Sequence, residues 1–124
     1  MVTTEAHIKQ WLHNRAHLAS MASAYPDWMV TASFYCALHA IDSLLSHDNV
    51  KSIISHKTRN DVLIWTNRYE AIRRAYLPLY DLSRTVRYLA EPERWVPLER
   101  IQKDVIVRYL YPIEKSVQHL VGRI

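Results

Sequence analysis

One segment constrains the fold of this chain more than any other. Residues Asp27–Ser46 (DWMVTASFYCALHAIDSLLS) are almost wholly apolar, yet they carry a narrow polar line. At about 100° per residue, a helix confines that line to about a quarter of its circumference. A helix that is apolar on nearly every side lies at the centre of a protein. We therefore expect a central helix here, with four of its side chains largely buried: Trp28, Cys36, Ala40 and Leu44.

Composition restricts the fold class. The chain has 124 residues, of which 49% are hydrophobic, and this suits one domain over residues 1–124 with a single core. Its one glycine is Gly122, so glycine-rich phosphate loops and tight hairpin turns are excluded. The predicted class is all-α, an up-and-down bundle of four to five helices.

Helix-start and helix-stop signals divide the rest of the chain. A first helix is predicted from Thr4 to about Ala24, and Thr58 with Asp61 forms a capping-box pattern that opens a third. The third helix should carry Trp65 on its apolar stripe and end near Leu77, because Pro78 cannot continue its hydrogen bonds. A fourth helix is predicted to begin at Pro78. A last helix over 98–121 should kink at Pro112 and end at Gly122.

The sequence predicts a cytoplasmic protein with no membrane partner. The N-terminal segment MVTTEAHIKQW has an acidic residue and no apolar core, so it does not resemble a secretory signal. The apolar stretch over 27–45 is interrupted by Tyr35, His39 and Asp42, which disfavours a membrane span.

No metal or cofactor is predicted. His13 and His17 have the i, i+4 spacing that can chelate zinc, but no third ligand lies near them in the sequence. Cys36, His39 and Asp42 follow at i, i+3 and i+6, which suggests a nucleophile. The apolar surroundings of Cys36 favour a core residue instead, because a reactive thiolate needs an electropositive and partly exposed setting.

Charge is concentrated in one part of the chain. Residues 51–88 hold eight basic and three acidic residues, for a net charge of +5. Arginine outnumbers lysine eleven to five, and its planar fork suits phosphate as well as carboxylate. Nucleic acid is therefore a candidate partner, and a solvated basic face is the alternative. The candidate nucleic-acid-binding residues are Lys57, Arg73, Arg74, Arg84 and Arg87.

The central third of the chain resembles the HEPN domain superfamily. The resemblance rests on the helix SFYCALHAIDSLL at 33–45, on a polar loop with Ser55-His56, and on Arg59-Asn60 in the next helix. It implies a small, HEPN-like helical bundle, usually dimeric. Many members are metal-independent endoribonucleases of toxin–antitoxin, antiviral defence or RNA-processing systems, and others are non-catalytic partner modules.

Active members of that superfamily share an Arg-polar-x4–6-His motif, and this chain departs from it. Arg59-Asn60-Asp61 matches the start, but Ile64, Trp65 and Thr66 stand where a histidine should follow. His56 lies three residues before Arg59, so it could reach the same phosphate in reversed order. The candidate catalytic residues implied by the resemblance are His56, Arg59 and Asn60, and a cap with a solvated loop is the alternative.

The polar line of the central helix gives a second candidate site. Tyr35, His39 and Asp42 predict a polar cleft between helices. The alternative is a buried histidine that hydrogen-bonds Asp42 or Tyr35. The resemblance and the four Trp and eight Tyr residues predict a homodimer.

Three function classes follow. The first is an RNA-binding, HEPN-like endoribonuclease, and the second is an RNA-binding module without chemistry. The third is a non-catalytic structural subunit of a larger complex, such as a nucleotidyltransferase pair or a ribonucleoprotein.

Overall fold

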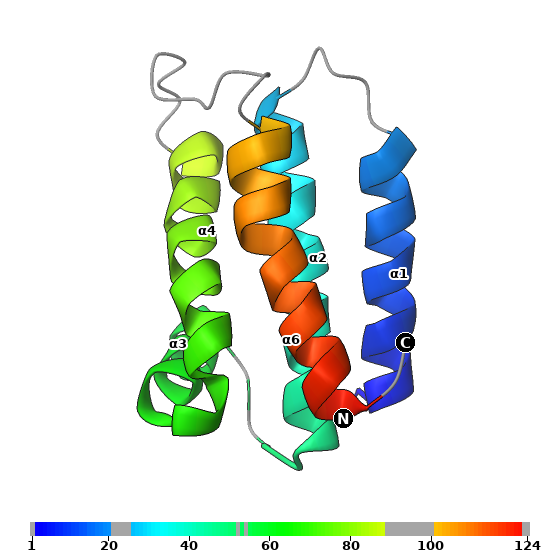
Figure 1. Ribbon diagram of the computed structural model, residues 1–124, viewed down its shortest axis with the longest axis vertical. Helices are drawn as coiled ribbons and strands as arrows, with labels where there is room; N and C mark the ends of the chain where they lie inside the picture. Colours follow the sequence, from blue (N-terminus) through cyan, green and yellow to red (C-terminus); the bar gives the residue numbers. More distant parts are fainter. Residues whose placement is uncertain (1, 21–25, 52, 54, 89–100, 123–124) are drawn as a thin grey trace.

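A central helix, α2 (Pro26–His47), organises the fold (Figure 1). The computed structural model describes residues 2–20, 26–51, 53, 55–88 and 101–122. Over these residues the chain is helical and contains no strand, which confirms the predicted all-α class. The other elements are α1 (Thr4–Ser20), α3 (His56–Trp65), the short 3-10 helix η1 (Asn67–Tyr69), α4 (Glu70–Tyr88), the π-helical segment η3 (Ile101–Leu110) and α6 (Tyr111–Val121).

α2 packs against α1, α4, η3 and α6, so the other long helices surround it. In Figure 1 it lies behind α6, between α1 and α4. Its side chains at Phe34, Cys36, Ala40 and Leu44 are fully buried. The small residues among them let neighbouring helices approach closely, while the large ones fill the core. The predicted central helix and the burial of Cys36, Ala40 and Leu44 are confirmed.

The prediction that Trp28 is buried is wrong, because its side chain is 58% exposed. Trp28 lies on the polar side of α2, one turn before Thr31 and two turns before Tyr35. All three line a groove that Gln10 and Asn14 of α1 border. Trp28 therefore lies in this groove and not in the core.

α2 also has the composition of a membrane-spanning helix. Among the described residues, Trp28–His47 is the one stretch long and apolar enough to cross a membrane, and 61% of it is buried inside the bundle. The core helix of a soluble protein has the same properties. The cellular location stays a prediction.

The region predicted to form the third helix is interrupted at Thr66. α3 begins at His56 because the hydroxyl of Ser55, and not of Thr58, accepts the free Thr58 N–H at 3.1 Å. It ends after Trp65, where Thr66 adopts an extended conformation. Trp65 lies at this break and is 83% exposed, so its predicted place on the apolar stripe is wrong.

α4 continues through Pro78, and the predicted boundary at Leu77 is wrong. An internal proline removes one backbone hydrogen bond. Here Pro78 is exposed, while an apolar stripe extends along the helix on both sides of it: Ile72, Tyr76, Leu79 and Val86 are buried. Burial of this continuous apolar stripe offsets the loss of one backbone hydrogen bond, so α4 remains a single helix.

The C-terminal helix changes its winding beside Pro112. Residues 101–110 are π-helical, and α6 is α-helical with Pro112 in its first turn, so the change of winding falls beside the residue that lacks an N–H. Gly122 ends α6 in the left-handed region at φ 81°, as predicted. The predicted start over 98–100 lies outside the described residues, as do residues 21–24 of the predicted first helix.

Asp48 holds the end of α2 against η1. Its carboxylate accepts two hydrogen bonds from Arg68, at 2.8 and 3.1 Å, and one from the Tyr69 hydroxyl at 2.5 Å. Arg68 also donates to the Leu120 carbonyl of α6 at 3.4 Å. Burial alone would raise the pKa of Asp48, but hydrogen bonds from Arg68, Tyr69 and His47 lower it below its ordinary value.

We predict that Asp48→Asn makes stability less sensitive to acid. Because the folded-state pKa of Asp48 is depressed, its carboxylate stabilises the fold above the ordinary value of 3.8, and this is lost as the pH falls through the folded pKa. Urea midpoints measured at pH 6 and at pH 3 should differ less in Asp48→Asn than in the unmodified protein. An equal difference in both proteins would contradict this role.

Candidate functional site

A buried ion pair between α2 and α3 forms the centre of the candidate site. The Arg59 guanidinium donates through Nε to Asp42 Oδ1 at 2.7 Å and through one terminal nitrogen to Oδ2 at 2.9 Å. Asp42 is 9% exposed and Arg59 is 7% exposed. A two-point pair of this kind fixes the direction of both side chains. Burial alone would lower the pKa of Arg59, but the bonds to Asp42 raise it, so the guanidinium stays charged.

Local sequence places both partners. Asp42 lies on the polar line of α2, in the half of that helix that faces α3. Arg59 occupies the first turn of α3, whose start the Ser55 cap fixes, and its own N–H donates to the Ser55 carbonyl at 3.1 Å. The cap therefore sets the position from which Arg59 reaches Asp42.

His56 and Tyr76 flank the guanidinium. The second terminal nitrogen of Arg59 lies 3.4 Å from His56 Nδ1. Because a guanidinium only donates, Nδ1 is the acceptor in this contact. Tyr76 interacts electrostatically with Arg59, although its hydroxyl makes no hydrogen bond of standard geometry. Burial raises the pKa of Tyr76 and keeps the phenol protonated.

An aromatic cluster continues from this pair toward α4. The ring centroids of His56 and Tyr80 lie 5.4 Å apart, and Phe34 lies 5.8 Å from the rings of His56 and Tyr76. The guanidinium carbon of Arg84 lies over the Tyr80 ring, 5.8 Å from its centroid. His56, Tyr80 and Arg84 therefore lie together across α3 and α4.

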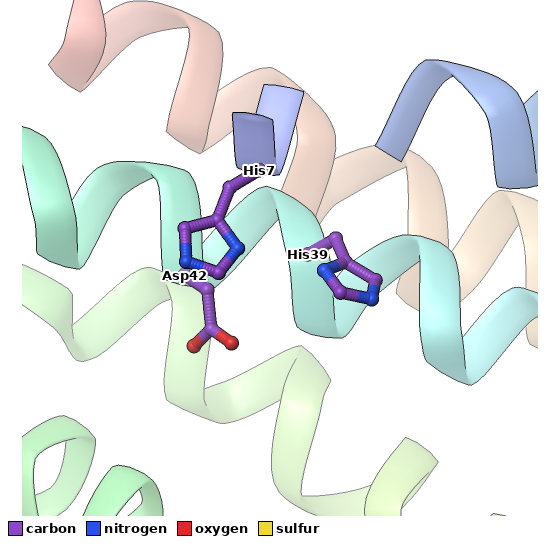
Figure 2. Close-up of side chains that lie close together, drawn as sticks. All are labelled: His7, His39 and Asp42. Carbon is purple, nitrogen blue, oxygen red and sulfur yellow. The ribbon is translucent and has the colours of Figure 1, made fainter. Parts of the chain in front are cut away.

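On the other side of the cluster, α1 contributes a histidine. His7 lies near His39 and Asp42 of α2, and the two imidazole centroids are 5.8 Å apart (Figure 2). Burial lowers the pKa of both histidines, while the charge of Asp42 raises it in part. Both rings are therefore neutral at pH 7.

The structure brings two of the predicted catalytic residues together. His56 and Arg59 are in contact, but Asp42 occupies two of the three guanidinium nitrogens. Asn60 follows Arg59, and its buried side-chain oxygen has no hydrogen-bond partner within the described part of the chain. Arg59 is thus placed to orient His56 rather than to lie open on a surface.

The predicted nucleic-acid-binding residues are not gathered in one place. Lys57 pairs with Asp61 at 2.8 Å and Arg74 with Glu70 at 2.6 Å. Arg73 donates to the Ile64 carbonyl at the end of α3. Arg84 lies over the Tyr80 ring, and the side chain of Arg87 lies outside the described residues.

The residues of the predicted polar line face two different parts of the molecule. Tyr35 and His39 line the groove between α1 and α2. Asp42 points to Arg59 instead, and His39 Nδ1 has no hydrogen-bond partner among the residues that the structure describes. His39 therefore lies at a groove and not in a hydrogen-bonded core position.

Cys36 is a core residue. It is fully buried, and burial raises the pKa of its thiol to about 12. A thiol with that pKa is not a nucleophile at neutral pH. This agrees with the core interpretation of its sequence surroundings.

Sequence reasoning missed His7, Tyr76 and Tyr80 as members of the site. Tyr76 and Tyr80 have an ordinary helical spacing, and their approach to Arg59 and His56 depends on how α3 folds back on α4. His7 is far from His39 in the sequence, and only the antiparallel packing of α1 on α2 joins them. The hydrogen bond from Thr4 to Ser46, at 2.8 Å, fixes the register of that packing.

Comparisons with protein-family models, with characterised proteins and with solved structures found no match to this chain.

We predict that removing either partner of the buried pair is strongly destabilising. Arg59→Met leaves the Asp42 carboxylate buried without its counter-charge, which costs about 3–5 kcal/mol. The double variant Asp42→Leu, Arg59→Met removes both charges and should regain most of that loss. Urea unfolding followed by tryptophan fluorescence measures these free energies.

A matched control is the exposed pair of Lys57 and Asp61 on α3. Lys57→Met should leave the free energy of unfolding nearly unchanged, because exposed i, i+4 pairs contribute little. A loss in Arg59→Met no larger than in this control would contradict a structural role for the buried pair.

Proposed function

We propose that this protein binds RNA, as a HEPN-like helical bundle, through a surface formed by His56, Tyr80 and Arg84. The observation that carries the proposal is that the Tyr80 ring lies 5.4 Å from the His56 ring and 5.8 Å from the Arg84 guanidinium carbon, across α3 and α4. Proteins that bind single-stranded nucleic acid combine aromatic side chains, on which bases stack, with cationic side chains that contact phosphate. We refer to these three residues as the α3–α4 surface.

The charge state of Arg84 supports the proposal. Within the described part of the chain, Arg84 forms no ion pair, whereas Arg59, Arg68 and Arg74 each pair with an acid. Arg84 is exposed and already lies over an aromatic ring. Its charge is thus available to phosphate, and the net charge of +5 over residues 51–88 favours the approach of a polyanion.

The contact between His56 and Arg59 supports a catalytic form of the proposal. Cleavage of RNA by attack of the 2′-hydroxyl on phosphorus needs a group that moves protons at the 2′-oxygen or at the leaving 5′-oxygen. With Nδ1 accepting from Arg59, the neutral imidazole carries its proton on Nε2, which can donate a hydrogen bond to a phosphate oxygen; to accept a proton at Nε2, the ring must release Arg59 and carry its proton on Nδ1. Metal-independent endoribonuclease activity, in a toxin–antitoxin or antiviral defence system, is the specific activity that we propose to test.

We predict that Arg84→Ala weakens RNA binding and flattens its salt dependence. Loss of one phosphate contact should lower the slope of log K against log salt by about one unit, whatever the RNA sequence. Fluorescence anisotropy with a labelled single-stranded RNA at several salt concentrations measures both quantities.

Arg74→Ala is the matched control, because it removes the same charge from an exposed position on the same helix where Glu70 already pairs with it. It should change the affinity less than Arg84→Ala. Equal affinity in the unmodified protein and in folded Arg84→Ala would overturn the proposal. It would instead favour a non-catalytic partner subunit, the alternative function.

We predict that His56→Ala abolishes any cleavage and weakens binding less than Arg84→Ala does, because a neutral imidazole adds little charge but can transfer a proton. The assay is incubation of the purified protein with mixed RNA in EDTA, followed by gel analysis of products. Cleavage that persists at the full rate in His56→Ala would exclude this histidine from catalysis.

We also propose that two copies associate, as the resemblance implies. Exposed Trp28 and Trp65 support this, at 58% and 83% exposure, because large aromatic side chains are enriched at interfaces. The mass from light scattering, measured on the RNA-binding sample, should be about twice the chain mass of 14.6 kDa.

A further inference from the structure

Three side chains on α1 and α2 have the composition of a metal site. His7, His39 and Asp42 each offer one ligand atom, and these atoms all lie within 4.8 Å of one another (Figure 2). Two imidazoles with one carboxylate suit divalent transition metals, whereas Ca²⁺ and Mg²⁺ prefer oxygen alone. The sequence predicted no metal here, because helix packing alone brings His7 to the other two.

Each of the two histidines has one buried ring nitrogen whose hydrogen bonding needs an explanation. His7 Nδ1 and His39 Nδ1 are buried and have no hydrogen-bond partner among the described residues. Buried polar atoms without a partner are rare, and each one calls for an explanation. A bound ion supplies one for both nitrogens. Their burial also favours the neutral imidazole, which is the form that binds a metal.

The ion pair described above would orient the carboxylate ligand. Both Asp42 oxygens accept hydrogen bonds from Arg59, and each oxygen keeps a further lone pair. Hydrogen bonds from an outer residue commonly hold a metal-binding carboxylate in place. Arg59 also offsets the charge of Asp42, so the two histidines would provide most of the affinity.

The distances require only side-chain movement. Bonds of about 2.0–2.2 Å place the ligand atoms of a tetrahedral site about 3.4 Å apart. The most widely separated donors, at up to 4.8 Å, would close by about 1.4 Å through rotation of the imidazole rings. His39 also lines the groove between α1 and α2, which gives an ion a route of entry.

We propose that His7, His39 and Asp42 bind one divalent transition-metal ion per chain, with Zn²⁺ as the probe. Three protein ligands leave a fourth position open toward the groove, as in sites that hold a water molecule or a substrate. This proposal does not depend on RNA binding, which involves the α3–α4 surface.

The test is calorimetric titration of the full chain with Zn²⁺, and with Co²⁺ for visible absorption. The unmodified protein should bind one ion at this site, with a Co²⁺ spectrum typical of tetrahedral coordination. His7→Gln and His39→Gln should each weaken binding at least tenfold and remove that spectrum. The matched control is His13→Gln, His17→Gln, which deletes an exposed histidine pair of α1 with chelating spacing and should change neither result.

A second measurement uses the unmodified protein, so its result does not depend on whether the histidine variants fold. Imidazole ¹⁵N chemical shifts should move for His7 and His39 on addition of Zn²⁺, while those of His47 and His119 stay unchanged. No stoichiometric binding would overturn the proposal, as would binding that only the His13 and His17 variant abolishes. Shifts confined to histidines other than His7 and His39 would overturn it as well.

Discussion

The buried pair of Asp42 and Arg59 is the interaction on which the rest of the site depends. A carboxylate in the middle of an apolar central helix is costly to bury unless a partner satisfies it. Arg59 satisfies it from the first turn of α3, and in doing so it fixes α3 against α2. The remaining guanidinium nitrogen of Arg59 contacts His56, which precedes Arg59 by one helical turn.

The pair also separates two surfaces with different chemistry. On the side of α4, His56, Tyr80 and Arg84 present a ring and a cation, which suits a nucleic acid. On the side of α1, His7 and His39 present neutral nitrogens beside the carboxylate, which suits a metal ion. Arg59 would contact neither a nucleic acid nor a metal ion directly, because Asp42 holds its side chain in the interior. Its role is to position His56 and Asp42.

The sequence was most informative where local patterns decide the structure. The apolar character of Asp27–Ser46 identified the central helix, and Gly122 identified the end of the last one. It was wrong where packing overrides a local rule: α4 continues through Pro78 because a buried stripe spans it, and Trp28 faces a groove. The site was predicted only in part. His56 and Arg59 share a helix turn, so sequence placed them together. The Asp42–Arg59 and His7–His39 contacts join separate helices, and no sequence pattern specifies that register.

The most direct test of this account is the exchange rate of the Arg59 Nε–H proton with water, measured by NMR at neutral pH. A charge-assisted hydrogen bond inside the bundle should protect that proton strongly, and Asp42→Asn should remove most of the protection. Arg84, which is exposed, provides the reference within the same spectrum. An Arg59 proton that exchanges as fast as that of Arg84 would contradict the central role of the pair.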